Sequence, residues 1–600
     1  MQALSAASSW FDGASPHAAA ELLALLLPLL PLDARACAAC VCRAWRAATA
    51  HPALWEELRF ERGGVNAVTD ATLASLCARA GAALRTLYLD AGACNRVTAD
   101  GFVAALRDGG CVGLRRLDAQ RRVWWEDFTL CFGGEQVALL AAACPLLEYT
   151  ACVVESEGVN PEILTALPAL PGPLELYCSG GSGGEAQAAQ LAACLRGNTG
   201  VTSLAIRFDR DGAAVLAQLA DCLRVNTTIT SLDLTENEIF EEGATHLAEC
   251  LLVNAALKSL SLDCTHIGDA GATQLAESLR VNTTLTDLDL CDISIGVEGV
   301  AQLAACLRVN ATLMSLRLGY CGFGDEGVAR LADSLRVNAA LTKLRLESCG
   351  IGDAGAAQLA ESLRVNATLT SLDLRFNDIG VAGTAQLADC LRVNTTLTSL
   401  DLSRNEICDE CTTHLAACLR VNTTLTDLEL SGSGIRVEGA AQLADCLRVN
   451  TTLTSLGLDC NHYIDDESVT QLAACLRVNA TLMSLRLSYC GLGNEGAVQL
   501  ADSLRVNATL TRLDLHHNNI GATGATVLAD CLFNAALKSL NLAWNNIGDE
   551  GAAQLAASLH VNATLTSLFV MSERISEDVG ALQLAECLRV NTTLKSLRWR

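Results

Sequence analysis

The residues of this chain with the clearest capacity for chemistry are its 28 cysteines. One cluster, Cys408-x-x-Cys411-x-x-His414-x-x-x-Cys418, has the ligand types and the close spacing that a tetrahedral zinc site uses. Cys418, however, belongs to a column of cysteines that recurs along the chain, and Cys408 and Cys411 stand where other copies of the same segment have glycine. We therefore expect core thiols here and no bound metal.

The cysteines of that column interchange with serine, which indicates a small, tightly packed position. Its cysteines are Cys194, Cys222, Cys250, Cys306, Cys390, Cys418, Cys446, Cys475, Cys531 and Cys587, and its serines are Ser278, Ser334, Ser362, Ser503 and Ser558. An export signal would favour disulfides, but the apolar stretch from Leu22 to Leu32 has no Lys or Arg before Arg35. It is also about half as long as the roughly 20 apolar residues that a membrane span needs. We expect reduced thiols in a cytoplasmic or nuclear protein without a membrane segment.

Catalytic patterns are missing from the sequence. No glycine-rich phosphate loop follows an expected strand, and the nine histidines show no spacing that would pair them with a nucleophile. The eleven Asn-x-Thr sequences resemble glycosylation sites, but each arises where a helix-ending Asn precedes the Thr of the next strand. We expect a protein that is not an enzyme and binds no cofactor, and we expect no glycans at these asparagines.

These columns exist because most of the chain repeats every 28 residues. The segment Leu-Arg-Val-Asn places its Asn at 226, 282, 310, 338, 366, 394, 422 and 450, and the interval further along varies between 27 and 29 residues. Such one-residue changes are expected in loops. In the copy that begins at Leu369, Leu372 and Leu374 alternate with polar residues, which predicts a short strand with one buried face. Leu387 and Leu391 follow at helical spacing, so each repeat is expected to contain one strand and one helix.

The connections between these elements also follow from the sequence. The Asn that ends each helix is expected to adopt the left-handed backbone conformation, which Asn tolerates better than other non-glycine residues. Stacked parallel strands lie about 4.8 Å apart, whereas packed helices need about 8 to 10 Å. The array must therefore bend with its strands inside the curve. The expected fold is an α/β horseshoe solenoid.

The first half of each unit, Leu-x-x-Leu-x-Leu-x-x-Asn, followed by Gly-x-x-Gly and a full helix, resembles the leucine-rich repeats of ribonuclease-inhibitor type. NOD-like receptors and the Ran GTPase activator carry repeats of the same type. The resemblance runs from residue 186 to residue 600 and implies a leucine-rich-repeat solenoid that binds another protein. It does not identify that protein.

The N-terminal segment departs from the repeat and resembles an F-box, through V-C-x-x-W-R from residue 41 and P-x-L-W-x-x-L from residue 52. In the F-box family this small helical domain binds the adaptor protein of a cullin-type ubiquitin ligase, and the repeats behind it hold the substrate. The resemblance implies that the helical core and the adaptor-facing surface are formed by Leu30, Val41, Trp45, Leu54 and Trp55. The alternative is a helical cap that only closes the end of the solenoid.

Four parts are therefore expected along the chain. Residues 1–18 are a disordered tail, residues 19–62 the F-box-like helical domain, residues 63–185 diverged leucine-rich repeats, and residues 186–600 regular repeats. A stretch rich in proline and glycine, 164–184, is expected to be a loop between the two blocks of repeats.

Two variable strand positions distinguish one repeat from the next. The position between the two leucines carries Arg317, Arg345, Arg486 and, in other repeats, Asp373, Asp401 and Glu429. The second residue after the second leucine is equally variable; it is a ring or an arginine at Tyr320, Phe376, Arg404, Tyr489, His517 and Trp544, and in other repeats it is Glu236, Cys264, Asp292, Ser348, Gly432 or Cys460. Half-exposed aromatic and arginine side chains are typical of protein interfaces, so we expect these arginines and rings to bind a partner, with Trp544 as the main anchor. The acidic residues between them would attract Lys or Arg side chains of that partner.

The net charge of −25 argues against a protein that follows nucleic-acid phosphates and favours a neutral or basic partner protein. The expected function is a substrate receptor of a cullin-type ubiquitin ligase, with the adaptor on the F-box-like segment and an unidentified protein substrate on the repeats. Two alternatives remain open: a stand-alone inhibitor or scaffold resembling ribonuclease inhibitor or the repeats of NOD-like receptors, and a Ran-type GTPase activator.

Overall fold

The computed structural model describes residues 57–60, 69–89, 97–118, 139–140, 142–144, 149–151, 153–157, 172–179, 189, 191–193, 195–208, 212–532, 536–572, 575, 580–587, 591, 593–594 and 596–598. The chain divides into two compact units, Met1–Asp289 and Leu290–Arg600. Within the described residues, no helix is both long and apolar enough to cross a membrane.

The first unit is built from parallel strands and intervening helices. Its elements are β1 (Glu57–Phe60), α5 (Asp70–Ala80), the 3-10 helix η4 (Gly81–Ala83), β2 (Thr86–Leu89), α6 (Ala99–Asp108), β3 (Arg116–Asp118), β4 (Tyr149–Ala151), β5 (Val153–Glu157), β6 (Gly172–Ser179), β7 (Val201–Phe208), α10 (Gly212–Leu223), β8 (Ser231–Asp233), α11 (Phe240–Leu251), β9 (Ser259–Ser261), α12 (Gly268–Leu279) and β10 (Asp287–Asp289). One sheet has four strands in the order β1-β2-β3-β4, and β5 to β10 pair in sequence order, also in parallel. Strand–helix alternation therefore begins well before residue 186.

Two segments of this unit differ from the expectations. Glu57–Phe60 lies in the segment expected to be helical, yet it is a strand that pairs in parallel with β2. Gly172–Ser179 lies in the expected loop, yet it is a strand between β5 and β7. The register shifts beside Pro173, which has no N–H to donate, so the sheet accommodates the proline near the beginning of the strand.

The second unit continues the same alternation. Its elements are α13 (Val297–Leu307), β11 (Ser315–Arg317), α14 (Gly324–Leu335), β12 (Lys343–Arg345), α15 (Asp353–Leu363), β13 (Ser371–Asp373), α16 (Val381–Leu391), β14 (Ser399–Asp401), α17 (Asp409–Leu419), β15 (Asp427–Glu429), α18 (Val437–Leu447), β16 (Ser455–Gly457), α19 (Asp466–Leu476), β17 (Ser484–Arg486), α20 (Asn494–Leu504), β18 (Arg512–Asp514), α21 (Ala522–Cys531), β19 (Ser539–Asn541), α22 (Gly548–Leu559), β20 (Ser567–Phe569), α23 (Gly580–Cys587) and β21 (Ser596–Arg598).

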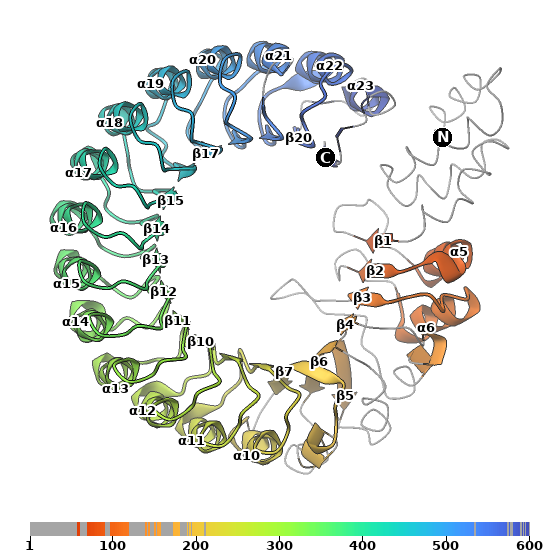
Figure 1. Cartoon of the computed structure of the whole chain (residues 1–600). Coiled ribbons are helices and arrows are strands. Elements are labelled where there is room, and N and C mark those ends of the chain that lie inside the picture. Colours follow the sequence, from red (N-terminus) through yellow and green to blue (C-terminus); the bar gives the residue numbers. More distant parts are fainter. Residues whose placement is uncertain are drawn as a thin grey trace. The chain divides into compact units, whose positions relative to one another are not determined.

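Within the second unit the strands form the inner layer of an arc and the helices the outer layer (Figure 1). Strands β11 to β21 pair in sequence order and in parallel, which aligns leucines such as Leu344, Leu372 and Leu400 in adjacent strands. Each of these three side chains is only 1% exposed, and full burial of one leucine contributes roughly 1.5–3 kcal/mol. The predicted strand–helix solenoid is confirmed.

The change in repeat length near residue 460 is accommodated outside the regular elements. Ser455 pairs with Ser484 rather than with residue 483, so this repeat has one extra residue. The additional length lies in the loop between β16 and α19, as expected.

The asparagines at the helix ends join successive repeats through their side chains. The Oδ1 atom of Asn394 accepts hydrogen bonds from the N–H groups of Thr396 at 3.0 Å and Leu397 at 2.8 Å, and its Nδ2 atom donates to the carbonyl of Leu363, one repeat earlier, at 2.7 Å. Asn394 is 4% exposed and is not among the residues with positive φ, so the expected left-handed conformation was wrong. The helical turn continues through Arg392, and the Asn N–H still bonds to the carbonyl of Cys390. Because the amide nitrogen is already engaged inside the protein, this geometry argues against a glycan at these asparagines.

A second asparagine column stabilises the turn after several of the strands. The Oδ1 atom of Asn377 accepts hydrogen bonds from the N–H groups of Cys349 and Ile351, both at 3.0 Å, and its Nδ2 atom donates to the carbonyls of Leu346 at 2.8 Å and Leu374 at 2.9 Å. One side chain therefore satisfies four backbone groups in two repeats.

The cysteine column forms part of the core, as predicted for its described members. The Cys418 thiol donates to the carbonyl of Leu415 at 3.1 Å, and the Ser334 hydroxyl makes the same contact with Leu331 at 2.7 Å. The equivalent bond explains why the two residue types interchange. Burial raises the pKa of Cys418 to about 12, so its thiol stays protonated.

Candidate partner-binding surface

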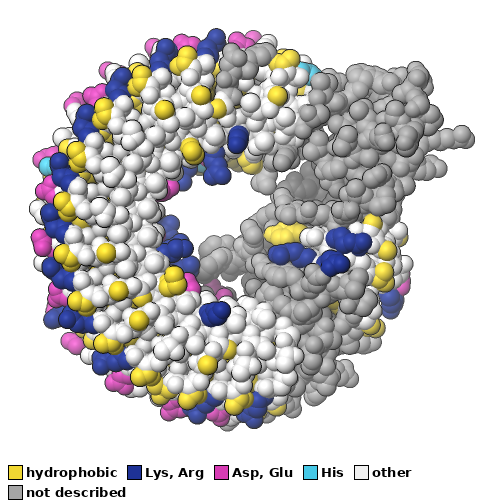
Figure 2. Space-filling view, in the orientation of Figure 1, with side chains coloured by type: hydrophobic (Ala, Val, Ile, Leu, Met, Phe, Trp, Pro, Cys, Tyr) yellow, Lys and Arg dark blue, Asp and Glu magenta, His cyan; other side chains and the backbone are white. Residues whose placement is uncertain are grey.

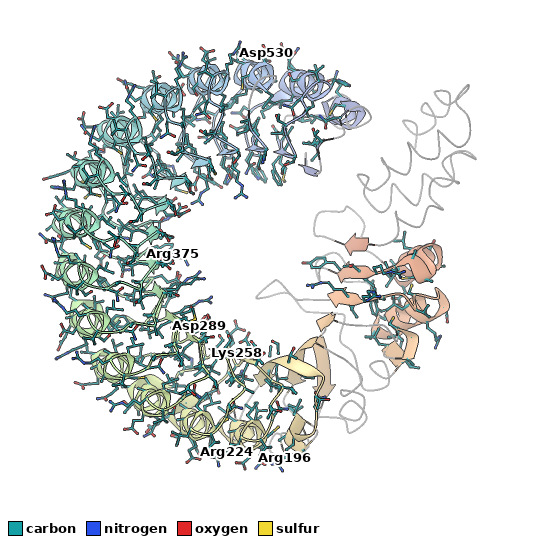
Figure 3. All side chains as sticks on the ribbon, in the orientation of Figure 1. Arg196, Arg224, Lys258, Asp289, Arg375 and Asp530 are labelled. Atoms are coloured by element: carbon teal, nitrogen blue, oxygen red, sulfur yellow. The ribbon has the colours of Figure 1, made fainter. Side chains whose placement is uncertain are left out.

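The predicted partner-binding residues all lie in the second unit, on the inner strand face or in the turn that follows it. Arg317 and Arg345 occupy paired positions in β11 and β12, and both are exposed. Figure 3 shows Arg375 on the strand side of this unit and Asp530 on the helix side, so the two faces carry different sets of side chains.

The turn residues share a backbone conformation that the sequence analysis did not anticipate. Tyr320, Phe376, Arg404, Tyr489, His517 and Trp544 all have φ between 51° and 57°. The equivalent residues of other repeats, Glu236, Cys264, Asp292, Ser348 and Cys460, also have positive φ, and Gly432 takes the same place in one repeat. This left-handed region costs a non-glycine residue roughly 1–2 kcal/mol. The repeat tolerates the cost because each N–H is held by the next repeat, as in the bond from Phe376 to the carbonyl of Ser403 at 2.9 Å.

Three of these turn residues form a continuous stack of rings, which we call the aromatic ladder: Tyr489, His517 and Trp544. The ring centroids of Tyr489 and His517 are 4.0 Å apart and those of His517 and Trp544 are 5.2 Å apart, with 13° between the ring planes in both pairs. Trp544 remains 47% exposed and Tyr489 39% exposed. Desolvation and the neighbouring His516 lower the pKa of His517, so its ring is neutral at neutral pH. The ladder offers a preformed, half-exposed aromatic surface over three repeats.

The first predicted stretch combines exposed rings with exposed arginines. The Arg404 guanidinium lies over the Phe376 ring, 5.8 Å from its centroid, and Phe376 and Tyr320 are 48% and 52% exposed. An arginine held against an aromatic ring keeps its charge while its motion is restricted, which suits an interface residue.

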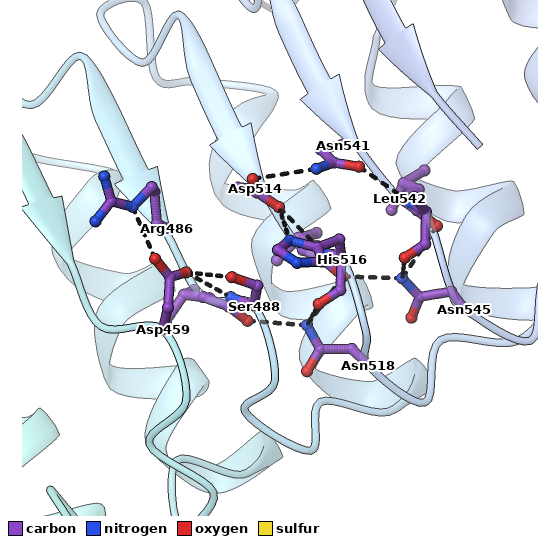
Figure 4. Close-up of polar contacts among 12 residues, drawn as sticks. Asp459, Arg486, Ser488, Asp514, His516, Asn518, Asn541, Leu542 and Asn545 are labelled. Atoms are coloured by element: carbon purple, nitrogen blue, oxygen red, sulfur yellow. Dashed lines mark hydrogen bonds and ion pairs between the residues drawn. The ribbon is translucent and has the colours of Figure 1, made fainter. Parts of the chain in front are cut away.

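Arg486 is already paired within the chain. Its Nε atom donates to Asp459 Oδ2 at 2.7 Å, and its Nη2 atom contacts Glu429 two repeats earlier. Figure 4 shows Asp459 also receiving the Ser488 N–H and hydroxyl, beside a second network in which Asp514 accepts from His516 and Asn541. Burial raises the pKa of Glu429 to about 7, and the Arg486 charge works in the opposite direction. These contacts fix the Arg486 side chain and reduce its suitability as an anchor.

The strand-face residues that the sequence analysis missed occupy the position directly after the second leucine: Glu347, Arg375, Asp459 and His516. Arg375 pairs with Glu347 of the preceding repeat and lies 3.4 Å from Asp373. A signal was present, since Glu347 and Arg375 carry opposite charges one period apart.

The acidic residues of the strand face are less available than expected. Asp373 is buried, and Asp401 and Glu429 are half-buried. Oδ1 of Asp373 accepts the Arg375 N–H at 3.1 Å and Oδ1 of Asp401 accepts the Ser403 N–H at 2.9 Å, so both carboxylates cap the turn. The expectation that these residues would attract basic side chains is therefore not favoured by the geometry.

The exposed charge of the second unit differs between its two faces. Arg317, Arg345 and Arg404 are exposed on the strand side, whereas exposed carboxylates such as Asp333 and Asp389 lie on helices. In the view of Figure 2, the inner rim of this unit shows mostly basic side chains, whereas the outer rim carries acidic and basic side chains together. The strand face thus presents positive charge although the chain as a whole is acidic.

Two further predictions concern the adaptor-binding residues and the absence of a metal site. Leu30, Val41, Trp45, Leu54 and Trp55, the adaptor-binding residues, lie outside the described residues. In the described part of the chain, no three His, Cys, Asp or Glu side chains gather in a geometry that would hold a metal ion.

The stacked strand–helix units define a solenoid repeat protein of the kind that serves as a protein-binding scaffold. Its family follows from the sequence comparison: the model described as Leucine Rich repeat matches residues 225–248, 253–276, 309–332, 337–360, 365–388, 393–410, 421–444, 449–473, 478–501, 506–529 and 533–556. The chain is a leucine-rich-repeat protein. A comparison with curated proteins finds no match.

Several solved structures are similar to the chain in fold. A TLR13–ssRNA13 complex has 15% identity and a TM-score of 0.47, with 90% of this chain and 68% of that chain covered. The yeast Rad7 and Elc1 complex has 16% identity and a TM-score of 0.37, covering 65% and 79%. An internalin from Listeria monocytogenes has 18% identity and a TM-score of 0.37, covering 65% and 94%. At these identities and TM-scores, none of them bears on function.

Proposed function

We propose that this leucine-rich-repeat protein holds a partner protein on the strand face of its second unit, with the aromatic ladder as the main anchor. The observation that carries the proposal is the ladder itself. Large rings occupy a strained backbone position, are stacked in advance and remain half-exposed. Interfaces concentrate their binding energy in a few such aromatic and arginine residues.

The exposed charge defines the partner's chemistry further. Arg345 and Arg404 are exposed on the same face. Asp373 and Asp401 cap turns, and Glu429 pairs with an arginine of the chain. A partner that fits this face carries acidic groups opposite these arginines and an apolar or aromatic patch opposite the ladder. The net charge alone favours a neutral or basic partner, and the exposed arginines of this face are the reason that we propose an acidic one.

The wider role we propose is that of a substrate receptor of a cullin-type ubiquitin ligase. Its support is the F-box-like sequence between residues 41 and 58, followed by a long repeat array. In this role the N-terminal segment binds the ligase adaptor and the strand face binds the substrate. The protein then takes part in ubiquitin transfer by positioning a substrate and has no catalytic residues of its own.

Affinity purification of the full-length chain tests both proposals, the partner-binding strand face and the receptor role. The cullin adaptor should co-purify and should be lost with Trp45→Ala or Leu54→Ala, while the partner of the strand face is retained. Trp544→Ala should weaken the binding of the partner by about 1–3 kcal/mol and leave the adaptor bound. If neither N-terminal variant changes adaptor recovery, the receptor role is wrong. A partner that is retained throughout would then favour the stand-alone scaffold or inhibitor.

A matched control separates the strand face from the helix face. Val393 is 55% exposed at the end of α16. Val393→Ala should leave partner binding unchanged if the strand face is the interface. Should helix-side changes abolish binding while Trp544, Tyr489 and Tyr320 variants remain neutral, the proposed face is wrong.

A further inference from the structure

Several helices of the second unit receive their N-terminal caps from the preceding repeat. The Asp353 Oδ1 atom accepts hydrogen bonds from the N–H groups of Gly380 at 2.8 Å and Gly383 at 2.7 Å, at the beginning of the next helix. Asp325, Asp409, Asp466, Asn494 and Asp549 act in the same way on the helices that follow them. An acceptor here satisfies free amides, and the carboxylates add negative charge at the positive end of the helix dipole.

Helix α17 lacks this cap. The preceding helix begins with Val381 where others have Asp, and the residues whose amides would be capped are Cys408 and Cys411. Cys408 is the N-cap residue and its side chain makes no capping bond; the Cys408 N–H faces the Cys411 sulfur instead of a carboxylate. Helix α19 also follows a valine, Val437, but supplies its own cap through Asp465. At α17, two thiols therefore stand at a helix N-terminus that lacks the carboxylate cap.

The two thiols are in contact with each other. Their sulfur atoms are 3.7 Å apart; Cys408 is exposed and Cys411 is buried. A disulfide needs a sulfur separation of about 2.05 Å, and the roughly 5 Å between Cα atoms three residues apart in a helical turn lies within the range that disulfides span. Side-chain rotation brings the sulfurs together without moving the helix.

A buried hydroxyl lies beside the Cys411 sulfur. Thr384 of the preceding repeat is 0% exposed, and its Oγ1 atom makes no hydrogen bond of standard geometry. It lies close enough to Cys411 to lower the pKa of that thiol, whereas burial, the larger effect, raises it to about 11. Donation from Thr384 would stabilise the Cys411 thiolate at the moment it forms.

We infer that Cys408 and Cys411 are a dithiol site that exchanges with small-molecule disulfides and closes to an intramolecular disulfide. The Cys408 thiolate attacks one sulfur of R–S–S–R, the S–S bond breaks, and one RS⁻ leaves. Cys411 loses its proton to solvent and attacks the Cys408 sulfur, which expels the second RS⁻. The protein gives up two electrons and two protons, and the small disulfide becomes two thiols. Cys408 begins the exchange because it is the exposed partner, and the N-terminal end of a helix stabilises negative charge next to it.

Oxidised glutathione is the probe for the test. Full-length protein is incubated with it, remaining thiols are alkylated, and the cysteine peptides are identified by mass spectrometry. We expect a peptide with a Cys408–Cys411 disulfide, while Cys418 and Cys446 react only after unfolding. Cys411→Ser should stop at one glutathione on Cys408, and Cys408→Ser should leave Cys411 unmodified.

Val381→Asp is the variant that isolates the helix end, since it restores the cap seen with Asp353. It should slow the reaction of Cys408 by about two- to fivefold, the change expected when roughly 0.3–1 kcal/mol of favourable dipole interaction is lost to a competing carboxylate. Two results would overturn the inference: a mixed disulfide on Cys408 that never closes onto Cys411, or a Cys408 that reacts no faster than Cys460, a half-exposed cysteine outside any helix N-terminus. An unchanged rate in Val381→Asp would overturn the proposed activation.

Discussion

The Trp544→Gly variant should be more stable to unfolding than the Trp544→Ala variant, although both substitutions remove the same ring. Trp544 has φ of 57°, its N–H bonds to the carbonyl of Met571, and its ring stacks on His517. Either substitution loses the stacking, about 0.5–1.5 kcal/mol. Alanine keeps the backbone cost of roughly 1–2 kcal/mol, whereas glycine avoids it and loses about 0.5–1 kcal/mol through its freer unfolded chain. The balance favours glycine by about 0.5–1 kcal/mol.

Hydrogen exchange measured on peptides from residues 539–572 can detect this difference, because a repeat protein opens locally and not only as a whole. Protection in Trp544→Gly should exceed that in Trp544→Ala by about two- to fivefold. Met483 is the control: it is 53% exposed and is not a positive-φ residue, so glycine there should be less protected than alanine. Equal or reversed protection at position 544 would refute the argument that this backbone conformation is strained.

Three further results are expected. Asn377→Ala should destabilise the second unit by roughly 2–4 kcal/mol in chemical denaturation, because four backbone groups lose their partner, and Asn377→Cys should cost less, because Cys349 already fills the equivalent position and donates to Leu318. Glu429 binds its proton more tightly in the native chain than in the unfolded one, so its contribution to stability is present below about pH 4.5 and is lost as the pH rises through about 7; Glu429→Gln should flatten that fall in urea midpoints measured from pH 4.5 to 8. Elemental analysis of protein purified without chelator should find substoichiometric zinc, and stoichiometric zinc that disappears in Cys411→Ser would contradict the assignment of these residues as thiols.

The repeat architecture was predictable because it depends on spacing. Leu372, Leu374 and Leu391 recur at intervals that specify a strand and a helix, and the recurring Cys and Ser positions mark the core. Composition misled the prediction at Gly172–Ser179, where Pro and Gly suggested a loop and the alternation of Leu174 and Leu176 was given too little weight.

The left-handed backbone of the second residue after the second leucine, which we call the turn column, could not be inferred from the spacing of residue types. A left-handed residue is usually recognised by glycine or asparagine, but here the position holds Tyr, Phe, Arg, His and Trp. The helix-ending Asn was wrongly predicted to be left-handed. Its side chain, and not an unusual backbone conformation, joins the successive repeats. The Arg486 ion pairs were hidden for another reason: its partners lie one and two repeats away, so they become neighbours only when the stacking is known.

The turn column separates what the backbone requires from what the side chain does. Its N–H is bound by the next repeat whichever residue is present, and residue types as different as Glu, Cys, Ser, Phe and Trp occupy it with φ near 55°. A single-codon change can therefore replace one side chain of the strand face while the backbone of the turn keeps its conformation. Unequal recombination between these similar repeats would insert or delete a whole repeat, which shifts the spacing of neighbouring rings by one strand. The gene for such a protein can vary the side chains of the strand face in two independent ways, by substitution within a repeat and by changing the number of repeats.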